Sequence, residues 1–455
     1  MDAQPLLAMT KSVAIIGGGF AGLSAGVYLA EKGFHVEVFE KRPLLGGRAY
    51  SVKDSKTGDT MDNGQHLMMG CYHHTLAFLE KIGTRHLLEF QEKMEVNFAD
   101  PQGRHFSLSC PNLPAPLHLL GGLIGFKKLS WSDKWAMMKL MAGVKKLNEK
   151  EFASLDSLSC EQWLTLWNQS LESIQSFWEP LILATLNEIP SIASAQMLAV
   201  VLRDALLKSK QDSLMVWSKV GLSELYTEAA PQFIENLGGK VHRRRGVQKI
   251  VFHESASKIE KLNLEDGSEH RADYYINACP PEALLASLDE KAASQDYFKS
   301  FSEITFSPIL GINLWFDRSI SEKSFTGLIE SPIHWMFNKA KVLSHCSKNY
   351  YSLVISGAYE LKDMPHEDLL KLALVELHKA FPQAREAQVL HHRILKELKA
   401  TPSFGIHSNR WRPSYQSPYS NFYLAGDWTA TGLPATIEGA VKSGYEVSEL
   451  LFAQV

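Results

Sequence analysis

Apolar residues form the clearest pattern at the two ends of the chain. Residues 13–40 begin with a run of β-branched residues, pass through a glycine-rich turn and a stretch of small apolar residues, and end in an alternating run. This order predicts a strand, a helix and a second strand, which form one βαβ unit. Residues 421–451 predict a short strand, a Gly-Asp turn, a loop and a helix that opens after Pro434. Both ends therefore indicate an α/β fold.

The segments between the ends differ from one another in pattern. Strands and turns are expected over residues 13–110, and a helix-rich block over about 130–235. Mixed strands with charged turns follow to about residue 280. A second β-rich stretch contains one helix near 366–380 and precedes the C-terminal unit. No internal repeat or low-complexity linker separates these parts of the sequence.

Composition narrows the class of protein. The 455 residues allow two or three domains, and 45% hydrophobic and 21% charged residues are typical of a globular protein. A net charge of -3 provides no global field for a phosphate backbone, and we interpret the triplet 243–245 (Arg-Arg-Arg) as a solvated face, so no nucleic acid is expected as a partner. The 5 cysteines are too scattered for a disulfide framework or a zinc site, which favours a reducing compartment and no metal.

We expect the protein to associate with the membrane surface and not to span the membrane. Residues 1–11 lack the basic segment of a signal peptide, and no run reaches the roughly 20 apolar residues of a spanning helix. Within 113–147, Trp131, Trp135 and Met138 recur at helical spacing among lysines. This pattern is typical of a helix lying on an anionic bilayer, and equally of a core helix with a solvated lysine face. We expect a cytoplasmic protein held peripherally at the inner face of the cytoplasmic membrane.

A nucleotide-binding fingerprint follows the first predicted strand. Gly17, Gly19 and Gly22 have the spacing G-x-G-x-x-G: the first allows a tight turn, the second lets the backbone reach a pyrophosphate, and the third lets helix and strand pack closely. Glu40 ends the second strand, where a carboxylate accepts hydrogen bonds from ribose hydroxyls and repels a 2′-phosphate. The pattern predicts binding of an adenosine diphosphate group; the alternative is a glycine turn that binds nothing.

Two further segments suit the rest of such a ligand. Gly47 and Arg48 offer a flexible backbone and a fixed positive charge to the same pyrophosphate. In the turn Gly426-Asp427, the carboxylate suits the ribityl hydroxyls of a flavin. The helix N-terminus that follows can point at flavin N1 and O2, where partial positive charge stabilises a reduced, anionic flavin. The residues expected at this N-terminus are Ala435, Thr436 and Ile437.

These ends, with residues 272–281 between them, resemble the superfamily of flavin-dependent amine oxidases and phytoene desaturases. Within it, segments such as LATLN at 183–187 and LPATIEGAV at 433–441 are narrower than the FAD motifs, and they are similar to the hydroxysqualene dehydroxylase family. The similar segments are 62–66, 177–196, 332–339 and 426–444. The resemblance implies FAD as cofactor and an α/β fold in which both chain ends build one FAD-binding domain.

The implied division is a Rossmann-like FAD-binding domain with an interleaved α+β substrate domain. The FAD-binding domain would comprise 1–105, 225–292 and 405–455, and the substrate domain 106–224 and 293–404. The resemblance also places a loop with Gly64 and Gln65 against the isoalloxazine ring, and Val247 against the adenine. We also expect Lys41, next to Glu40, to contact the cofactor.

The implied reaction is the reductive dehydroxylation of hydroxysqualene, a C30 isoprenoid alcohol, to squalene in hopanoid biosynthesis. Water is lost and N5 of the reduced flavin supplies a hydride, which requires a dry apolar tunnel, electron-rich walls and a proton donor. Among the candidate donors Asp62, His66 and Glu438, His66 leads because it lies in the flavin-facing loop. Aromatic residues that suit the walls, or simply the core, are Trp178, Trp217, Trp335 and Phe337.

Several alternatives remain open at the level of sequence. A carotenoid-type desaturase would share fold and cofactor but run the flavin in the oxidising direction. An amine oxidase would place an aromatic residue where this chain has Thr436. A flavin-binding scaffold without catalysis is a third alternative. Because no second G-x-G-x-x-G follows a strand, the electrons come from an external, unidentified donor or from NAD(P)H admitted at the flavin.

Overall fold

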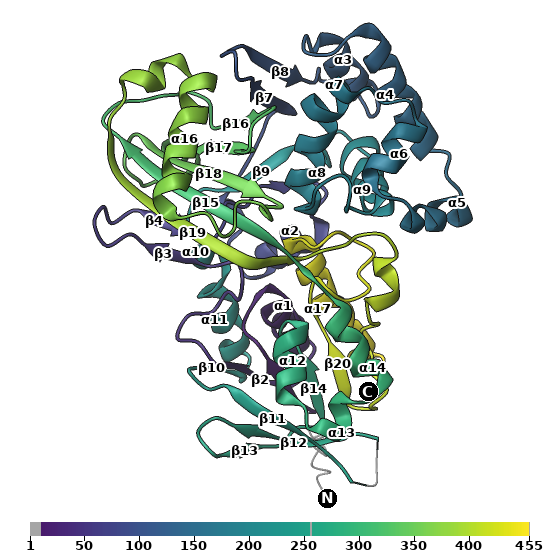
Figure 1. Cartoon of the computed structure of the whole chain (residues 1–455). Helices are drawn as coiled ribbons and strands as arrows, with labels where there is room; N and C mark the ends of the chain where they lie inside the picture. Colours follow the sequence, from purple (N-terminus) through teal and green to yellow (C-terminus); the bar gives the residue numbers. More distant parts are fainter. Residues whose placement is uncertain (1–10, 255–256, 455) are drawn as a thin grey trace, which may run out of the picture.

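A five-stranded parallel sheet forms the lower part of the molecule in a computed structural model, which describes residues 11–254 and 257–454 (Figure 1). The strand order is β10-β2-β1-β14-β20. The strands are β1 (Ser12–Ile16), β2 (His35–Glu40), β10 (Lys240–Arg243), β14 (Tyr274–Asn277) and β20 (Phe422–Leu424). One sheet therefore joins both ends of the chain, as the α/β prediction requires. The stretch 1–10, for which no signal peptide is expected, lies outside the described residues.

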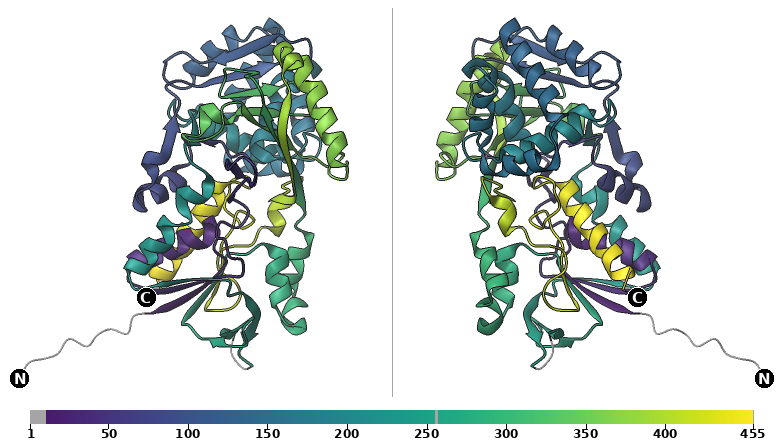
Figure 2. Two further views of the ribbon diagram at one scale, coloured as in Figure 1. Left: turned by 90° about the vertical axis from the view of Figure 1, so that its left-hand side faces the viewer. Right: turned by 90° about the vertical axis from the view of Figure 1, so that its right-hand side faces the viewer.

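Both faces of this sheet are covered (Figure 2). On one face lie α1 (Phe20–Glu31), α11 (Ala229–Asn236) and α17 (Ile437–Phe452). The other face packs against an antiparallel sheet and short helices. These are β11 (Val247–Phe252), β12 (Ile259–Leu264), β13 (Glu269–His270), α12 (Pro281–Ser287), α13 (Glu290–Ala293) and α14 (Asp296–Lys299). Because the sheet is buried on both faces, β1 is a continuous apolar run after its first residue.

The first and last helices of the chain pack directly on each other. Ser24 in α1 donates a hydrogen bond from Oγ to the carbonyl oxygen of Val441 in α17 at 2.9 Å. Gly444 lies at the closest approach, where an added Cβ would be 2.4 Å from the carbonyl oxygen of Ala21 and 2.7 Å from the backbone nitrogen of Ala25. The contact therefore depends on a residue without a side chain.

A seven-stranded sheet forms the upper part of the molecule (Figure 1). Its order is β19-β15-β18-β17-β16-β7-β8. The strands are β7 (Glu95–Ala99), β8 (His105–Ser109), β15 (Phe306–Phe316), β16 (Phe325–Leu328), β17 (Trp335–Asn338), β18 (Tyr350–Ser356) and β19 (Val389–Pro402). Helix α16 (His366–Ala380) covers one face and lies where the sequence predicts a helix. Since β7 and β8 pair with each other, the sheet continues across the expected boundary at residue 105, and the domain limits stay a prediction.

A block of helices covers the other face of this sheet, and side chains alternate between the two faces. Met336 packs with α16, whereas its neighbours Trp335 and Phe337 pack toward the helical block. The block contains α3 (Leu117–Gly125), α4 (Trp131–Val144), α5 (Glu149–Ser154), α6 (Cys160–Leu166), α7 (Leu171–Ser173), α8 (Glu179–Leu186), α9 (Ala195–Val201) and the π-helical turns η3 (Ile174–Trp178) and η4 (Leu202–Leu207). Within the described ranges, no helix is long and apolar enough to span a membrane.

Short elements connect the two parts of the molecule. Strand β9 pairs with β5 and β6, and β3 pairs with β4. The bounds are β3 (Ser51–Lys53), β4 (Thr60–Asp62), β5 (Met68–Met69), β6 (Leu88–Phe90), β9 (Met215–Ser218), α2 (His73–Lys81), α10 (Leu222–Tyr226) and α15 (Lys339–Val342). The short 3-10 turns are η1 (Arg85–Leu87), η2 (Leu155–Ser157), η5 (Ser300–Glu303), η6 (Pro382–Glu386) and η7 (Ser408–Trp411).

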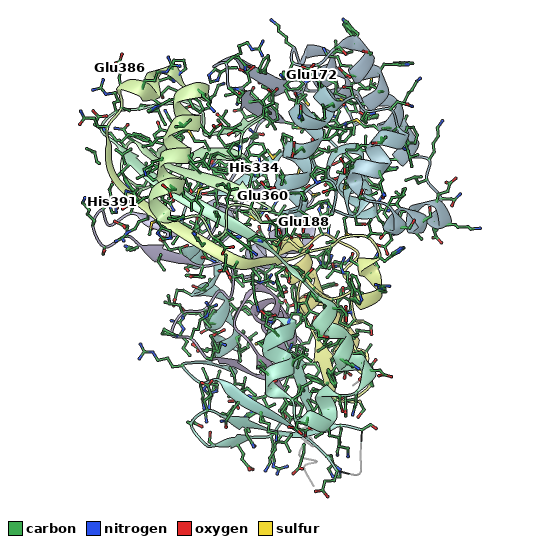
Figure 3. All side chains as sticks on the ribbon, viewed as in Figure 1. Glu172, Glu188, His334, Glu360, Glu386 and His391 are labelled. Carbon is green, nitrogen blue, oxygen red and sulfur yellow. The ribbon has the colours of Figure 1, made fainter. Side chains whose placement is uncertain are left out.

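The LATLN segment fixes the helical block to the large sheet. Asn187 ends α8 in a left-handed conformation with φ 49, and its amide donates to Oγ1 of Thr401 at 2.9 Å. Glu188 is fully buried and accepts from the hydroxyls of Tyr359 at 2.6 Å and Ser403 at 2.5 Å (Figure 3). A buried carboxylate needs such partners, so Asn187, the last residue of the motif, and the adjoining Glu188 both have a structural function at the junction.

The packing of α1 on α17 yields a prediction. Gly444→Ala places a methyl group against the backbone of α1, so we expect the free energy of unfolding to fall by about 1–3 kcal/mol. Gly125→Ala is the matched control, because nothing lies within 4 Å of its added Cβ. Urea denaturation followed by circular dichroism compares the two variants. An equal effect in both, or no loss in Gly444→Ala, would contradict the account of this contact.

Candidate flavin site

The N-terminus of α1 has the form of an anion site. Gly17 has φ +106, and a Cβ on Gly22 would lie 2.0 Å from the carbonyl oxygen of Gly17, so both positions require glycine. Helix α1 has no side-chain cap at Gly19 and no acidic residue in its first turn. Its first N–H groups and the positive end of the helix dipole are therefore available to a phosphate. The nearest atoms to a Cβ on Gly19 would belong to the backbone of Gly46 and Gly47, the closest at 3.6 Å.

Glu40 lies beside this turn, at the end of β2. It is 6% exposed, and its carboxylate accepts hydrogen bonds from the backbone N–H of Gly18 at 3.0 Å and of Arg42 at 2.9 Å. The backbone N–H of Arg245 donates to the Glu40 carbonyl at 2.9 Å, which brings the start of β11, with Val247, to the same edge. Lys41 is exposed to solvent. The expected ribose and adenine contacts are therefore neighbours, with Lys41 at their outer side.

Arg48 and Asp427 connect the two ends of the chain. The guanidinium of Arg48 donates to Oδ1 of Asp427 at 2.5 Å and to the carbonyl oxygen of Ala400 at 3.1 Å. The side-chain amide of Asn63 donates to the Arg48 carbonyl at 3.2 Å. The residues expected at the pyrophosphate and at the ribityl chain are therefore close together, and the loop containing Gly64 adjoins them.

A buried arginine organises the C-terminal loop, and the sequence patterns do not reveal it. Arg412 is 6% exposed and donates to the Thr429 carbonyl at 2.9 Å and to Oγ1 of Thr431 at 2.6 Å. Burial lowers the pKa of its guanidinium to about 10. Helix α17 begins at Ile437, slightly later than expected, because Thr436 is extended and its hydroxyl caps the helix by accepting from the N–H of Gly439 at 3.1 Å.

Glu438 joins α17 to α2. Its carboxylate accepts from the backbone N–H groups of His74 and Thr75, both at 2.9 Å, and from the Thr75 hydroxyl at 2.7 Å. The carboxylate therefore lies at the N-terminus of α2, where negative charge is stabilising. All of these contacts use Glu438 as an acceptor, so the geometry favours a structural role over proton donation.

A buried lysine, also missed by the sequence analysis, lies against the loop at 62–66. Lys339 is 1% exposed, and its Nζ donates to Oδ2 of Asp62 at 3.2 Å and to Oε1 of Gln65 at 2.5 Å. Asp62 also accepts from Oγ of Ser51 at 2.8 Å and from the backbone N–H of Leu222 at 3.1 Å. The only sequence signal was a lysine that directly follows the apolar run at 335–337.

His66 belongs to the same loop and is held as a neutral imidazole. Its Nδ1 lies 2.6 Å from the carbonyl oxygen of Gly64, which can only accept, so Nδ1 carries the proton. Burial lowers the pKa of His66, and the charge of Lys339 lowers it further, against the opposing effects of Asp62 and the Gly64 carbonyl. A neutral ring with its proton directed at Gly64 is better suited to accept a hydrogen bond than to donate a proton.

Three of the four expected wall residues gather around Phe325 on the inner face of the large sheet. The ring centroid of Phe325 lies 6.3 Å from Trp217, 6.4 Å from Trp335 and 6.1 Å from Phe337. We call these four residues the aromatic wall. Trp178 is not part of it: fully buried, it donates from Nε1 to Gln169 at 2.8 Å, as a core residue does.

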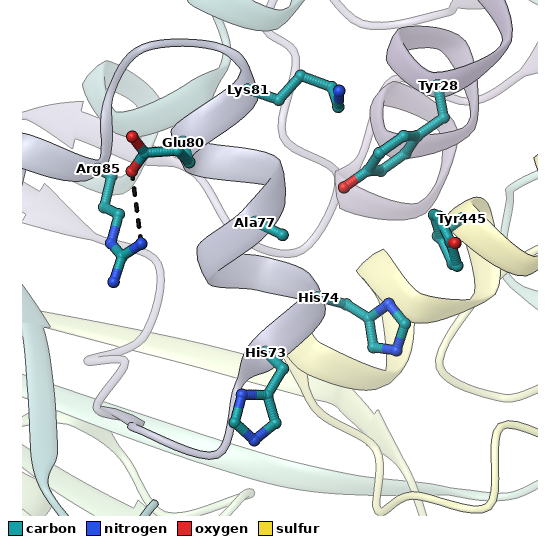
Figure 4. Close-up of a pocket in the computed structure, with 8 residues that line it drawn as sticks. All are labelled: Tyr28, His73, His74, Ala77, Glu80, Lys81, Arg85 and Tyr445. Carbon is teal, nitrogen blue, oxygen red and sulfur yellow. Dashed lines mark hydrogen bonds and ion pairs between the residues drawn. The ribbon is translucent and has the colours of Figure 1, made fainter. Parts of the chain in front are cut away.

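Two surface pockets lie outside the aromatic wall. One, of about 660 Å³, lies between α1, α2 and α17 and is lined by Tyr28, His73, His74, Ala77, Glu80, Lys81, Arg85 and Tyr445 (Figure 4). The other, of about 470 Å³, lies between α8 and the β16–β17 turn. In the second, burial raises the pKa of Glu179 and lowers that of His334 to about 4. No residue of the aromatic wall lines either pocket.

Taken together, these features define a dinucleotide-binding oxidoreductase. The parallel sheet, the glycine turn on α1 and the terminal helix converge at one place, as a flavin nucleotide requires. The chain belongs to the family of flavin containing amine oxidoreductases, whose sequence profile matches residues 20–451. It is an FAD-dependent oxidoreductase, which confirms the predicted cofactor and class.

Full-length relatives agree with this assignment. The chain is 29% identical to a hydroxysqualene dehydroxylase from Rhodopseudomonas palustris, covering 98% of this chain and 99% of the relative. It is 26% identical to a 15-cis-phytoene desaturase from Synechococcus elongatus, covering 97% and 96%. A solved oxidoreductase from Methanosarcina mazei shares the fold, with a TM-score of 0.74 and 18% identity over 96% of this chain and 100% of that one. The resemblance drawn from the sequence is therefore confirmed.

Proposed function

We propose that the protein reductively removes the hydroxyl group of hydroxysqualene to give squalene, a step of hopanoid biosynthesis. The observation that carries the proposal is that Lys339, buried and bonded to Asp62 and Gln65, follows Phe337 of the aromatic wall by two residues. An alcohol that loses water needs such a polar group beside an apolar chain, whereas desaturation of a hydrocarbon does not. The similarity to hydroxysqualene dehydroxylases over nearly the full chain supports the same substrate class.

The cofactor would be held by residues from both ends of the chain. The N–H groups at Gly19 and the first turn of α1 would bind the pyrophosphate, and Glu40 the adenosine ribose, with Val247 beside the adenine. Further contacts are proposed for Gly17, Gly22, Lys41, Gly47, Arg48, Gly64, Gln65, Gly426, Asp427, Ala435, Thr436 and Ile437. When bound in its reduced form, FAD supplies the hydride. Its electrons would come from an external donor or from NAD(P)H.

The protein's own residues would bind and shield the substrate. Trp217, Trp335 and Phe337 present electron-rich faces that stabilise positive charge at the reacting carbon, and they exclude water from it. Thr436 stands where an amine oxidase would have an aromatic residue, so one wall of an amine-binding cage is missing. These features favour an isoprenoid alcohol over an amine.

The direction of electron flow separates the proposal from a desaturase. Photoreduced enzyme, mixed anaerobically with hydroxysqualene, is expected to form squalene in proportion to the flavin that is reoxidised. Product analysis by mass spectrometry and flavin absorbance measure the two together. Reoxidation without squalene, or no reoxidation, would contradict the proposal. Oxidised enzyme mixed with phytoene is the comparison: bleaching of its flavin would instead favour the desaturase.

We also propose that α3 and α4 rest on an anionic membrane surface, where a C30 substrate is dissolved. Trp131 is 68% and Trp135 is 58% exposed, with Leu117 and Ile124 of α3 also exposed. Nearby exposed lysines are Lys127, Lys139, Lys145 and Lys146. The two tryptophans are therefore outside the core, and they form an apolar patch with a basic surround, which suits anionic headgroups.

This surface can be tested on lipid vesicles that contain phosphatidylglycerol. The double variant Trp131→Ser, Trp135→Ser is expected to bind at least about tenfold more weakly, because it removes two large apolar side chains from the contact. The matched control replaces two exposed leucines of β19, Leu390→Ser and Leu398→Ser, and should bind normally. Co-sedimentation measures the bound fraction. Equal binding by both double variants would contradict a contact through α3 and α4.

A further inference from the structure

Lys339 stands at the end of the aromatic wall. Alternate residues of an extended strand point to the same face, so Trp335 and Phe337 share the inner face of β17. The strand ends at Asn338, and Lys339 is the next residue, at the start of α15. Beyond it lies the loop that contains Asp62 and Gln65, its two hydrogen-bond partners. Burying an ammonium is costly even when it is paired. The pairing with Asp62 explains how the charge is tolerated, but not why a charge is placed beside an apolar wall.

Lys339 has a transferable proton that its neighbours lack. An ammonium carries three protons and no lone pair, and two of its protons are directed at Asp62 and Gln65. His66 is neutral and its ring proton is directed at Gly64. The Nε1–H of Trp335 has no hydrogen-bond partner within the described residues, but an indole does not release its proton near neutral pH.

Other titratable groups face this cluster from neighbouring elements. The charge of Asp59 acts on Cys346 and Tyr350, and Asp62 also acts on Tyr350. Burial raises the pKa of the Cys346 thiol to about 11, although Lys339 opposes this, and burial raises the pKa of Tyr350 above its usual range. The Cys346 thiol donates to the carbonyl oxygen of Ser347 and the Tyr350 hydroxyl to Oδ1 of Asn313, so neither proton is directed at the loop that contains Asp62 and Gln65.

We infer that Lys339 is the proton donor of the dehydroxylation, an inference that rests on the function proposed above. The ammonium transfers one proton to the hydroxyl oxygen as the carbon–oxygen bond breaks, and water leaves. The carbon accepts the hydride from reduced flavin, which is thereby oxidised, and the neutral amine regains a proton from solvent. Asp62 remains a carboxylate that holds the amine in position. Lys339 is thus a catalytic residue and Asp62 a positioning residue.

Single-turnover reduction of hydroxysqualene tests this role in three variants of the full-length, FAD-loaded protein. Lys339→Arg keeps the charge and its pairing with Asp62, but a guanidinium is a very weak acid. Lys339→Met leaves the Asp62 carboxylate unpaired, and the double variant Lys339→Met, Asp62→Asn removes both charges. Lys134→Met is the matched control, because Lys134 is also buried but bonds to the carbonyl oxygen of Ile124, away from the site.

We expect squalene formation to fall about 10²–10⁴-fold in all three Lys339 variants, the usual contribution of a general acid, and to be unchanged in the control. Urea denaturation of the apoprotein and FAD titration provide readouts separate from activity. The free energy of unfolding and the affinity for FAD should both be closer to the wild-type values in the double variant than in Lys339→Met, because no unpaired charge remains.

The outcomes separate this inference from the proposed function. If the wild type makes squalene and Lys339→Arg makes it at a similar rate, Lys339 serves only to hold the loop, and the inference is overturned. Should Lys339→Arg not fold, the double variant decides: turnover near the wild-type rate overturns the inference, and a loss of 10²-fold or more supports it. If the wild type makes no squalene, the proposed function falls and this inference falls with it.

Discussion

The contact between α1 and α17 is the constraint on which the rest of the structure depends. A flavin nucleotide is long, and here its expected binding elements come from opposite ends of the chain. The small residues at the crossing allow the helix backbones to approach closely, and β1 and β20 flank β14 in the same parallel sheet. The glycine turn and the N-terminus of α17 are therefore held in a fixed relation. The hydrogen bond from Arg48 to Asp427 also connects the two ends of the chain.

The inserted segments are placed by the same framework. Glu438 fastens the start of α17 to α2, and the loop at 62–66 contacts the large sheet where the side-chain amide of Asn63 donates to Glu397 of β19. Strand β17 brings its aromatic face and Lys339 to that loop, while Asn187 and Glu188 fix the helical block over the same face. An apolar region with a buried ion pair, Lys339 with Asp62, is thereby formed beside the proposed flavin position.

Much of the fold could be predicted from local sequence. The βαβ unit of residues 13–40 and the helix near 366–380 are local patterns, and both occur where the sequence places them. Only part of the candidate site could be predicted from the sequence. The glycine turn and Glu40 have a fixed spacing, but the partners of Glu438 are more than 360 residues away along the chain. Lys339 and Arg412 were missed because their burial depends on tertiary contacts, and a lone basic residue is usually a surface residue.

The measurement that tests the account most directly is an experimental structure of the FAD-bound protein. We expect the pyrophosphate to lie at the N-terminus of α1, Glu40 to contact the adenosine ribose, and the isoalloxazine ring to lie between the loop at 62–66 and the start of α17. A flavin bound elsewhere, for example in the groove between α1, α2 and α17, would contradict the claim that the two chain ends form its site.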